Sequence, residues 1–327
     1  MTAFGVWNDF GRLREVAVGD LRNSVIPSWD DSYRFVEPQT QELIHAFSGR
    51  RIFDVPELAE LAETVQGNLD NLAATYERYG VTVHRPRAWT EDELRWLAEF
   101  QTGGHQTFPA DPIWIIGRNV VECSLHTFCR NREIFPLREL IQPLIEAHPE
   151  ARHYAVPQSG PLNGDGPILE GGDILICGDD AKTVLVGLDP ARSSNLAGIN
   201  WLKRCLLDDG WNVVPVPITQ SAPIHLLGSV GVVGPETILV CREGLTTELP
   251  EPVKGWDIID VTLAEARKTG PCVVMIDDKT VLVPAETPRI AEELSRRGLD
   301  PVPVPCDGIS LLDGGIRCAT FVMRRDQ

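Results

Sequence analysis

Residues 201–217, WLKRCLLDDGWNVVPVP, carry the pattern that decides the fold. A helix-like stretch from Trp201 ends at Gly210, and a β-branched run from Val213 to Pro217 follows it. Glycine is the expected residue just past a helix end, because it adopts the left-handed conformation without steric cost. The segment therefore predicts a helix that stops at Gly210 and a strand directly after it.

The same helix-then-strand pattern recurs along the chain. Asn71–Gly80 leads into residues 81–86, Ile290–Gly298 leads into residues 302–305, and a weaker copy runs from Leu140 to Pro157. Between these copies lie pairs of short apolar runs split by a Gly or Asp turn, which is typical of β-hairpins. The pairs are 113–116 with 120–121, 174–176 with 184–186, 230–233 with 238–240, and 273–276 with 281–283. The chain thus consists of hairpin-helix-strand units repeated four or five times.

Units of this size around a strand-rich centre predict a cyclic α/β array about a pseudo-symmetry axis. Such an array is one domain, spanning residues 1–327. The alternative is a doubly wound parallel sheet, but its glycine-rich phosphate fingerprint after the first strand is absent, and Gly171-Gly172 is too short a match.

Charge and composition narrow the class of partner. Lys and Arg number 30 against 47 Asp and Glu, a net charge of -17, which disfavours nucleic acid and anionic membranes and favours a cationic small molecule. No apolar run approaches the roughly 20 residues that span a bilayer, so we expect a cytoplasmic protein. The eight cysteines form no CxxC pair, which disfavours both a disulfide framework and a zinc site.

Three segments place reactive side chains at predicted turns or strand starts: residues 169–173 (LEGGD), 223–226 (PIHL) and 313–320 (DGGIRCAT). Cys318 begins a strand beside the basic Arg317, so its thiol is a candidate thiolate nucleophile. The alternative for Cys318 is a buried core cysteine. Paired glycines shortly before Cys318, and again directly before Asp173, indicate that a ligand or another backbone comes close at both places.

His225 and Asp173 are the candidate partners of this cysteine. His225, at the head of a hairpin, would carry a proton to and from the substrate, work that suits a group titrating near neutrality. Asp173 would accept the other imidazole N–H and fix the orientation of the ring. Each residue also has a structural alternative: His225 could be a structural histidine, and Asp173 could cap a turn. Asp111, also before an apolar strand, offers a carboxylate that suits a planar guanidinium.

Several of these blocks together resemble the guanidine-modifying superfamily, and within it the glycine and inosamine-phosphate amidinotransferases. The resemblance runs over nearly the whole chain. Gly-Gly-x-x-Cys-x-Thr at 314–320, ending in Arg324-Arg325, is the most specific block. The other blocks are residues 6–9 with 15–19, 111–122, 170–173, 199–204, and His225.

The resemblance implies a five-bladed α/β propeller with a Cys-His-Asp site at its centre and neither a metal nor an organic cofactor. It assigns Cys318 as nucleophile, His225 as acid/base, Asp173 as the partner of the histidine and Asp111 as the guanidinium carboxylate. Glu170 is a candidate helper of Asp111. Two arginines, Arg242 and Arg317, are candidates for binding a substrate carboxylate.

Two positions depart from the family pattern. Ala110 stands where an arginine commonly precedes the first aspartate, and Leu227 stands where amidinotransferases and arginine deiminases usually carry a second aspartate after the histidine. Dimethylarginine hydrolases also lack that second aspartate. Without this aspartate we expect arginine to bind more weakly. Either another carboxylate replaces it, or the natural donor is a less polar guanidine.

The sequence therefore predicts an amidinotransferase that moves an amidino group from a guanidine donor to an amine acceptor through Cys318. One alternative is a guanidine hydrolase, in which water replaces the amine. Another is a non-catalytic protein that binds a guanidine or amine in an acidic cleft. A homodimer is compatible with each.

Overall fold

The computed structural model describes residues 4–29, 31–36, 38–99, 104–158, 166–178, 182–221 and 223–327. Its strands form five three-stranded sheets of one topology, in which the first two strands are antiparallel and the third is parallel to the second. The sheets are β5 (Ile113–Ile116), β6 (Asn119–Glu122) and β7 (Arg152–Ala155); β8 (Ile174–Gly178), β9 (Thr183–Leu188) and β10 (Asn212–Pro217); β11 (Val230–Gly234), β12 (Thr237–Val240) and β13 (Asp257–Asp260); β14 (Val274–Met275), β15 (Thr280–Pro284) and β16 (Asp300–Val304); and β17 (Thr320–Arg325), β1 (Leu13–Val18) and β3 (Thr82–His84).

Helices connect the second strand to the third in four of the five sheets, and other helices join the units. The connecting helices are α2 (Ala59–Arg78), α4 (Phe135–Ala147), α5 (Leu196–Leu206) and α7 (Pro288–Arg296), and the others are α1 (Pro38–Phe47), α3 (Glu91–Glu99), α6 (Leu263–Ala266) and α8 (Asp307–Ser310). Residues 241–256, between β12 and β13, have turns and a 3₁₀ segment instead of an α-helix. The predicted hairpin-helix-strand unit is thus confirmed in three continuous copies. A fourth lacks its helix, and in the fifth the first two strands, β17 and β1, come from the two ends of the described chain.

Glycines end three of these helices as the sequence predicts. Gly80, Gly210 and Gly298 have φ angles of 75°, 75° and 81°, and the N–H of Gly210 donates to the Leu207 carbonyl at 3.0 Å. This left-handed residue turns the chain back so that the next strand can join the sheet. Prolines of the β10 and β16 strands are tolerated because both are outer strands of their sheets.

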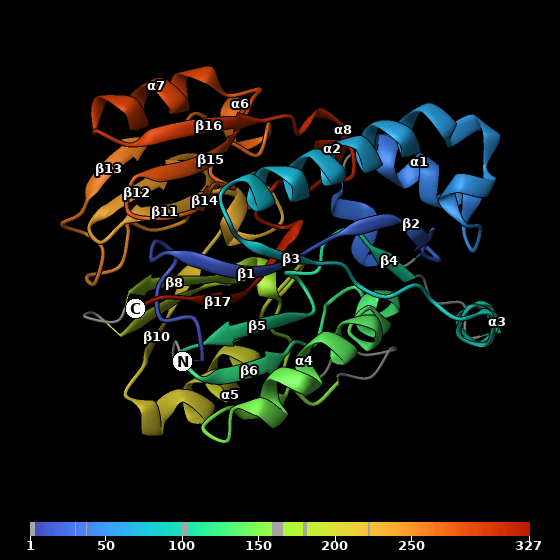
Figure 1. The fold of residues 1–327 in the computed structure, drawn as a ribbon, viewed down its shortest axis with the longest axis horizontal. Helices are drawn as coiled ribbons and strands as arrows, with labels where there is room; N and C mark the ends of the chain where they lie inside the picture. Colours follow the sequence, from blue (N-terminus) through green and yellow to red (C-terminus); the bar gives the residue numbers. More distant parts are fainter. Residues whose placement is uncertain are drawn as a thin grey trace.

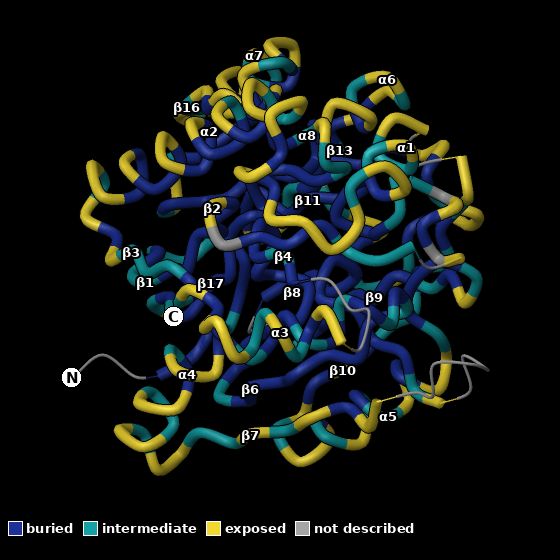
Figure 2. Tube along the Cα trace, turned by 90° about the vertical axis from the view of Figure 1, so that its right-hand side faces the viewer, coloured by how far each residue is buried: buried dark blue, intermediate teal, exposed yellow. Residues whose placement is uncertain are grey.

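The first strand of each unit lies innermost and is apolar. β5, β8, β11 and β14 are buried at every residue, and Figure 2 shows buried strands in the middle with exposed helices outside. β17 lies against β5, and β11 against β8. The last strand, β17, pairs with the first, β1, through Val18 and Thr320, so the two ends of the described chain share one sheet (Figure 1).

The predicted α/β class is therefore confirmed, whereas no sheet closes on itself into a barrel among the described strands. Among the described residues, no helix is both long and apolar enough to cross a bilayer.

One segment stands outside the repeated units, and the sequence pattern does not predict it. Residues 20–58, here called the cover segment, contain β2 (Asp20–Val25), a 3₁₀ turn η1 (Asp31–Phe35), α1 and a second turn η2 (Ile52–Asp54). β2 pairs with β4 (Gly104–Gln106) in a two-stranded antiparallel sheet. In Figure 1 the cover segment forms the blue lobe at one end of the molecule.

Candidate active site

The five turns that precede the innermost strands meet at the centre of the molecule. Each contributes a residue able to do chemistry: Asp111 before β5, Asp173 before β8, His225 before β11, Cys272 before β14 and Cys318 before β17. These residues stand one to five positions before the strand that follows each of them. The fold thus brings residues from all along the chain to one place.

Hydrogen bonds join these turns from one unit to the next. The links are Ala110 N–H to Cys318 O at 3.3 Å, Gly171 N–H to Asp111 O at 2.9 Å, Leu226 N–H to Asp173 Oδ1 at 3.0 Å and Cys272 S–H to Leu227 O at 3.2 Å. All of these atoms belong to turns and not to strand ladders. They fix the turns relative to each other, which is what a preorganised site needs.

The paired glycines Gly171 and Gly172 make this close approach sterically feasible. A Cβ on Gly172 would lie 2.3 Å from His225 Nδ1, and one on Gly171 would lie 1.8 Å from the Ala110 carbonyl oxygen. Neither distance is compatible with a side chain. The prediction that another part of the protein comes close to this double glycine is confirmed.

His225 is held by Glu170. Its Nε2 lies 2.5 Å from Glu170 Oε2, and Glu170 Oε1 accepts the backbone N–H of His126 at 2.5 Å. Burial alone would lower the pKa of His225, but the Glu170 hydrogen bond and the charges of Glu170, Asp111 and Asp173 outweigh it and raise this pKa to about 10. Burial acts to raise the pKa of Glu170, yet the hydrogen bond from His225 holds it below its usual value. The pair is therefore an imidazolium and a carboxylate at neutral pH.

Asp173 is not the hydrogen-bond partner of His225, and that prediction is wrong in its geometry. Asp173 Oδ1 accepts from Leu226 N–H at 3.0 Å and Oδ2 accepts from Ser194 N–H at 3.1 Å. Burial raises the pKa of Asp173, and these backbone donors partly offset it. The 3₁₀ turn η5 (Gly171–Asp173) separates the two carboxylates, so Glu170 faces the histidine while Asp173 binds the neighbouring backbone.

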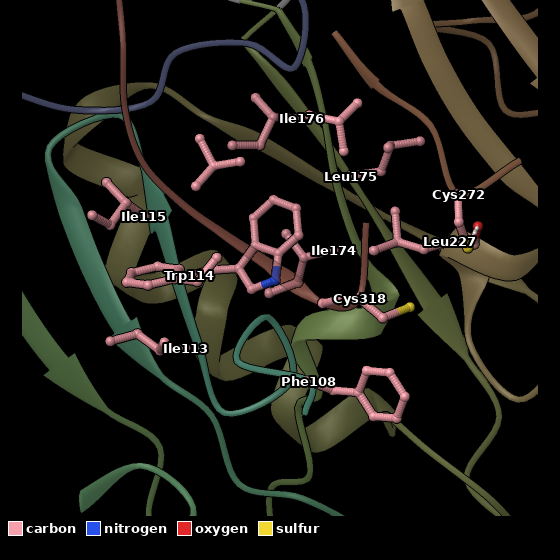
Figure 3. Packing of buried hydrophobic residues seen from close by; sticks show 14 of the residues in the cluster. Phe108, Ile113, Trp114, Ile115, Ile174, Leu175, Ile176, Leu227, Cys272 and Cys318 are labelled. Carbon is pink, nitrogen blue, oxygen red and sulfur yellow. Dashed lines mark hydrogen bonds between the residues drawn. The ribbon is translucent and has the colours of Figure 1, made fainter. Parts of the chain in front are cut away.

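Cys318 lies at the edge of the main apolar cluster, with Phe108, Trp114 and Leu227 among the other members (Figure 3). It is 8% exposed and lines a pocket together with His225, Glu170 and Asp111. The neighbouring Cys272 thiol lowers the pKa of Cys318, and burial opposes this without reversing it. The predicted cysteine thus has a microenvironment that favours thiolate.

Asp111 presents one engaged and one open oxygen. Oδ2 lies 3.0 Å from Arg130 Nη2, and the same guanidinium makes two bonds to Glu133 at 2.9 and 3.0 Å. Oδ1 is buried and has no hydrogen-bond partner among the described residues. A buried carboxylate oxygen without a donor is costly, so a donor from a ligand is expected at this position.

Neither of the two predicted carboxylate-binding arginines lines this pocket. Arg317 is 4% exposed, donates to Asp9 Oδ1 and the Thr320 carbonyl, and lies over the Trp114 ring. Arg242 is an exposed residue paired with Asp260 at 2.8 Å. Both arginines are engaged elsewhere, so their assignment to substrate binding is wrong.

Leu227 does not lie beside the substrate pocket, where the sequence comparison with the family had placed it. Its side chain is 2% exposed within the main apolar cluster. It lines a separate small cavity, next to Asp9 and Arg317, and not the pocket of Cys318. A less polar guanidine therefore has no space beside Leu227.

The sequence pattern missed Arg130, Cys272 and the proper role of Glu170. Glu170 stands three residues before Asp173 in the same block, and its one signal was the presence of two carboxylates around a double glycine. Cys272 had a weak signal, since it precedes the hairpin at 273–283 just as Asp173 and Cys318 precede their own strands. Arg130 gave no signal, because its contacts depend on tertiary structure.

Comparisons with known proteins identify similar chains. The L-arginine:L-lysine amidinotransferase of Pseudomonas savastanoi pv. phaseolicola is 23% identical over 348 residues, covering 98% of this chain and 93% of the relative. An amidinotransferase of the saxitoxin pathway from Microseira wollei has a TM-score of 0.81 at 20% identity, covering 99% and 98% of the two chains. A dimethylarginine dimethylaminohydrolase has a TM-score of 0.62 at 15% identity, covering 94% and 99%.

No family model matches the chain. The predicted resemblance is nevertheless confirmed, since the similar proteins include several amidinotransferases along nearly the whole length, and hydrolases share the fold.

Proposed function

We propose that this protein is an amidinotransferase, which moves the amidino group of arginine or a related guanidine to an amine through a covalent Cys318 intermediate. The observation that carries the proposal is the buried imidazolium of His225, held by Glu170 at 2.5 Å in the same pocket as Cys318. The similarity to amidinotransferases along nearly the whole chain supports the same reaction class.

Asp111 is the proposed guanidinium-binding carboxylate. Its buried Oδ1 accepts a hydrogen bond from the donor, and its charge offsets the positive charge that the donor brings into the pocket. Arg130 on the other oxygen holds the carboxylate in place. Glu170, the predicted helper of Asp111, serves the histidine instead.

In the first half-reaction the Cys318 thiolate attacks the guanidine carbon and forms a C–S bond. His225, protonated at neutral pH, donates its proton to the departing amine as the C–N bond breaks. Because Nε2 faces Glu170, Nδ1 is the nitrogen left for this transfer. The products are a free amine, an amidino-thioether on Cys318 and a neutral imidazole.

In the second half-reaction an amine attacks the amidino carbon, and His225 accepts its proton. The C–S bond breaks, the thiolate leaves, and the new guanidine dissociates. The charges of Glu170 and Asp173 favour the returning imidazolium. Nucleophile and proton carrier are thus restored together.

Hydrolysis is the second candidate function. The absence of a carboxylate at Leu227 and the shared fold with a dimethylarginine dimethylaminohydrolase favour it. Water then replaces the amine in the second half-reaction, and the product is a ureido compound. The roles of Cys318 and His225 are the same in both reactions. The non-catalytic alternative is disfavoured, because Cys318 and His225 share a pocket in an arrangement that suits proton transfer.

We further infer that the five units surround the site as five blades of a single domain. The links between successive turns support this order. So does the close approach of Gly315 to Cys272, where a Cβ on Gly315 would lie 2.6 Å from the Cβ of Cys272, because this contact joins the unit of β14 to the one that holds the last strand. We also propose the cytoplasm as its compartment, because eight unpaired thiols suit a reducing environment.

The test is a covalent adduct on Cys318. Wild-type protein mixed with arginine and quenched in acid should carry an amidino mass increment on the peptide containing Cys318, and Cys318→Ala should carry none. Cys205→Ala is the matched control, since Cys205 is the one cysteine that is not buried, and it should keep the adduct. An adduct on another cysteine, or turnover in Cys318→Ala, would end the proposal. The same protein is then incubated with arginine and a panel of amines. Guanidino products indicate amidino transfer, and ureido products indicate hydrolysis.

A further inference from the structure

The cover segment supplies most of the apolar lining of the Cys318 pocket, here called the wall, together with the polar Ser24, Tyr33 and Thr40. The wall residues come from β2, η1, α1 and η2 and the turns beside them: Val25, Ile26, Val36, Leu43, Ile44 and Ile52. The pocket that these residues share with Cys318 encloses about 950 Å³ of space, a figure that includes open solvent.

The charged and nucleophilic groups of the pocket all lie outside the cover segment, and they include His105 and Asp313. Asp111, Arg130, Glu170, His225 and Cys318 all come from the turns and loops of the repeated units. A substrate whose reacting nitrogen lies beside Cys318 and His225 therefore extends its remaining part toward the apolar wall.

A substrate carboxylate finds no uncommitted positive charge on the described lining residues. Arg130 is their sole arginine or lysine, and Asp111 and Glu133 already neutralise it at 3.0 and 2.9 Å. His105 is neutral, because burial and the charge of Arg130 hold its pKa well below the usual value. An amino-acid end of a substrate would have to displace one of these ion pairs or remain in solvent.

We propose that the acceptor is a primary amine with an uncharged alkyl or arylalkyl chain, which packs against the cover-segment wall. This inference rests on the proposed amidino transfer and specifies its acceptor. The amine nitrogen bonds to the amidino carbon of Cys318, the C–S bond breaks, and the amine proton passes to neutral His225. The product is an alkylguanidine whose chain stays on the wall until release.

The reverse reaction gives a direct measurement, because the product alkylguanidine is also a donor. Ethylguanidine and hexylguanidine are mixed separately with the protein, and the single-turnover rate of Cys318 adduct formation is followed by mass spectrometry. Burial of the four additional methylenes should raise the rate at subsaturating donor between about tenfold and about 200-fold. In the forward direction, with arginine as donor, hexylamine should be amidinated with a higher kcat/KM than glycine or lysine.

Two wall variants test the location of the chain. Leu43→Asn and Val36→Asn change partly exposed side chains of the wall, so both proteins are expected to fold. Each should reduce the hexyl-to-ethyl rate ratio by about tenfold. Leu311→Asn is the matched control, since Leu311 is 47% exposed and adjacent to the lining residue Leu312 without lining the pocket. Its ratio should equal that of wild type.

The outcomes separate this inference from the function on which it rests. Equal rates for ethyl- and hexylguanidine, a preference for glycine or lysine over hexylamine, or an unchanged ratio in both wall variants would overturn the apolar-acceptor proposal and leave amidino transfer in place. No Cys318 adduct from arginine or from either alkylguanidine would overturn both.

Discussion

The centre of the molecule and the cover segment are held in place by different forces. At the centre, buried hydrogen bonds join turn to turn, and Asp173 and Glu170 have both carboxylate oxygens engaged. The cover segment is attached through the β2–β4 pair, a few hydrogen bonds such as Leu21 N–H to Gln66 Oε1 at 2.9 Å, and apolar packing.

This difference separates chemistry from selectivity. Buried hydrogen bonds are directional and tolerate little displacement, so they suit groups that must meet a reacting atom. Apolar contacts are non-directional and tolerate side chains of similar volume, so they suit recognition of a substrate chain. Changes at the centre should therefore abolish catalysis, and changes in the cover segment should mainly alter which substrate is used.

The largest effect should follow Glu170→Gln, which retains an amide oxygen for the His126 N–H but loses the charge beside His225. Loss of the charge of a triad acid costs about 10⁴-fold in turnover, and we expect a loss of that order. The wild-type rate should fall above pH 10, where His225 loses its proton. Without the Glu170 charge this pKa falls, so the decline should begin at lower pH. Steady-state pH profiles measure both effects.

Asp173→Asn is the comparison for that variant. An asparagine leaves one of two backbone donors facing an NH₂ group, so the free energy of unfolding should fall by about 1–3 kcal/mol. The pH profile should shift less than in Glu170→Gln. A larger shift in Asp173→Asn would restore Asp173 as the main partner of the histidine.

Leu227→Asp should be the most destabilising of these changes. It places a carboxylate within the apolar cluster, at a cost of at least about 3 kcal/mol in the free energy of unfolding, which urea denaturation measures. Leu227→Met should cost less than about 1.5 kcal/mol. A stable Leu227→Asp protein that uses arginine better than wild type does would show that this side chain reaches the substrate after all.

Gly172→Ala tests the tolerance of the centre. The added Cβ would lie 2.3 Å from His225 Nδ1, so the imidazole must move, and a displacement near 1 Å can cost about 10²-fold in rate. We expect a folded protein with turnover reduced by about that factor. Circular dichroism and the rate of Cys318 adduct formation distinguish misplacement from unfolding. Wild-type turnover would mean that the histidine can act from a second position.

The same substitution in the cover segment should have the smallest effect. Gly49 has a φ of 77°, a Cβ added to it would meet no atom within 4 Å, and its N–H donates to the Ile26 carbonyl at 2.9 Å. An alanine at position 49 would have to adopt an unfavourable left-handed conformation but would clash with no other atom. Gly49→Ala should therefore lower the free energy of unfolding by about 1 kcal/mol. Ethylguanidine should still modify Cys318 at the wild-type rate. A strong loss would tie the cover segment to the chemistry.

Much of the fold follows from local patterns in the sequence. The hairpin at 174–186 and the glycine-ended helix before 213–217 depend on alternation, periodicity and C-cap preference, which act between near neighbours. The cover segment depends on contacts with β4 and with the pocket, far apart in sequence, and it has no repeat to reveal it. The pairing of β1 with β17 is equally long-range.

At the site, local patterns located the reactive residues but not their contacts. Cys318 and His225 stood out by residue type and by their position before a strand. Choosing between Glu170 and Asp173 requires the direction of each side chain around the turn η5, which the local sequence pattern does not specify. The assignment of Arg317 failed because its partners, Asp9 and Trp114, come from other units.

The pairing of Val18 with Thr320 has a consequence for how the protein is made. During translation β1 leaves the ribosome first among the strands and has to wait for β17 to complete its sheet, and Cys318 emerges just before β17. A nascent chain therefore contains the histidine and the carboxylates long before it contains the thiol. Under the proposed mechanism such a chain lacks its nucleophile, and the site is complete only when β1 and β17 have met.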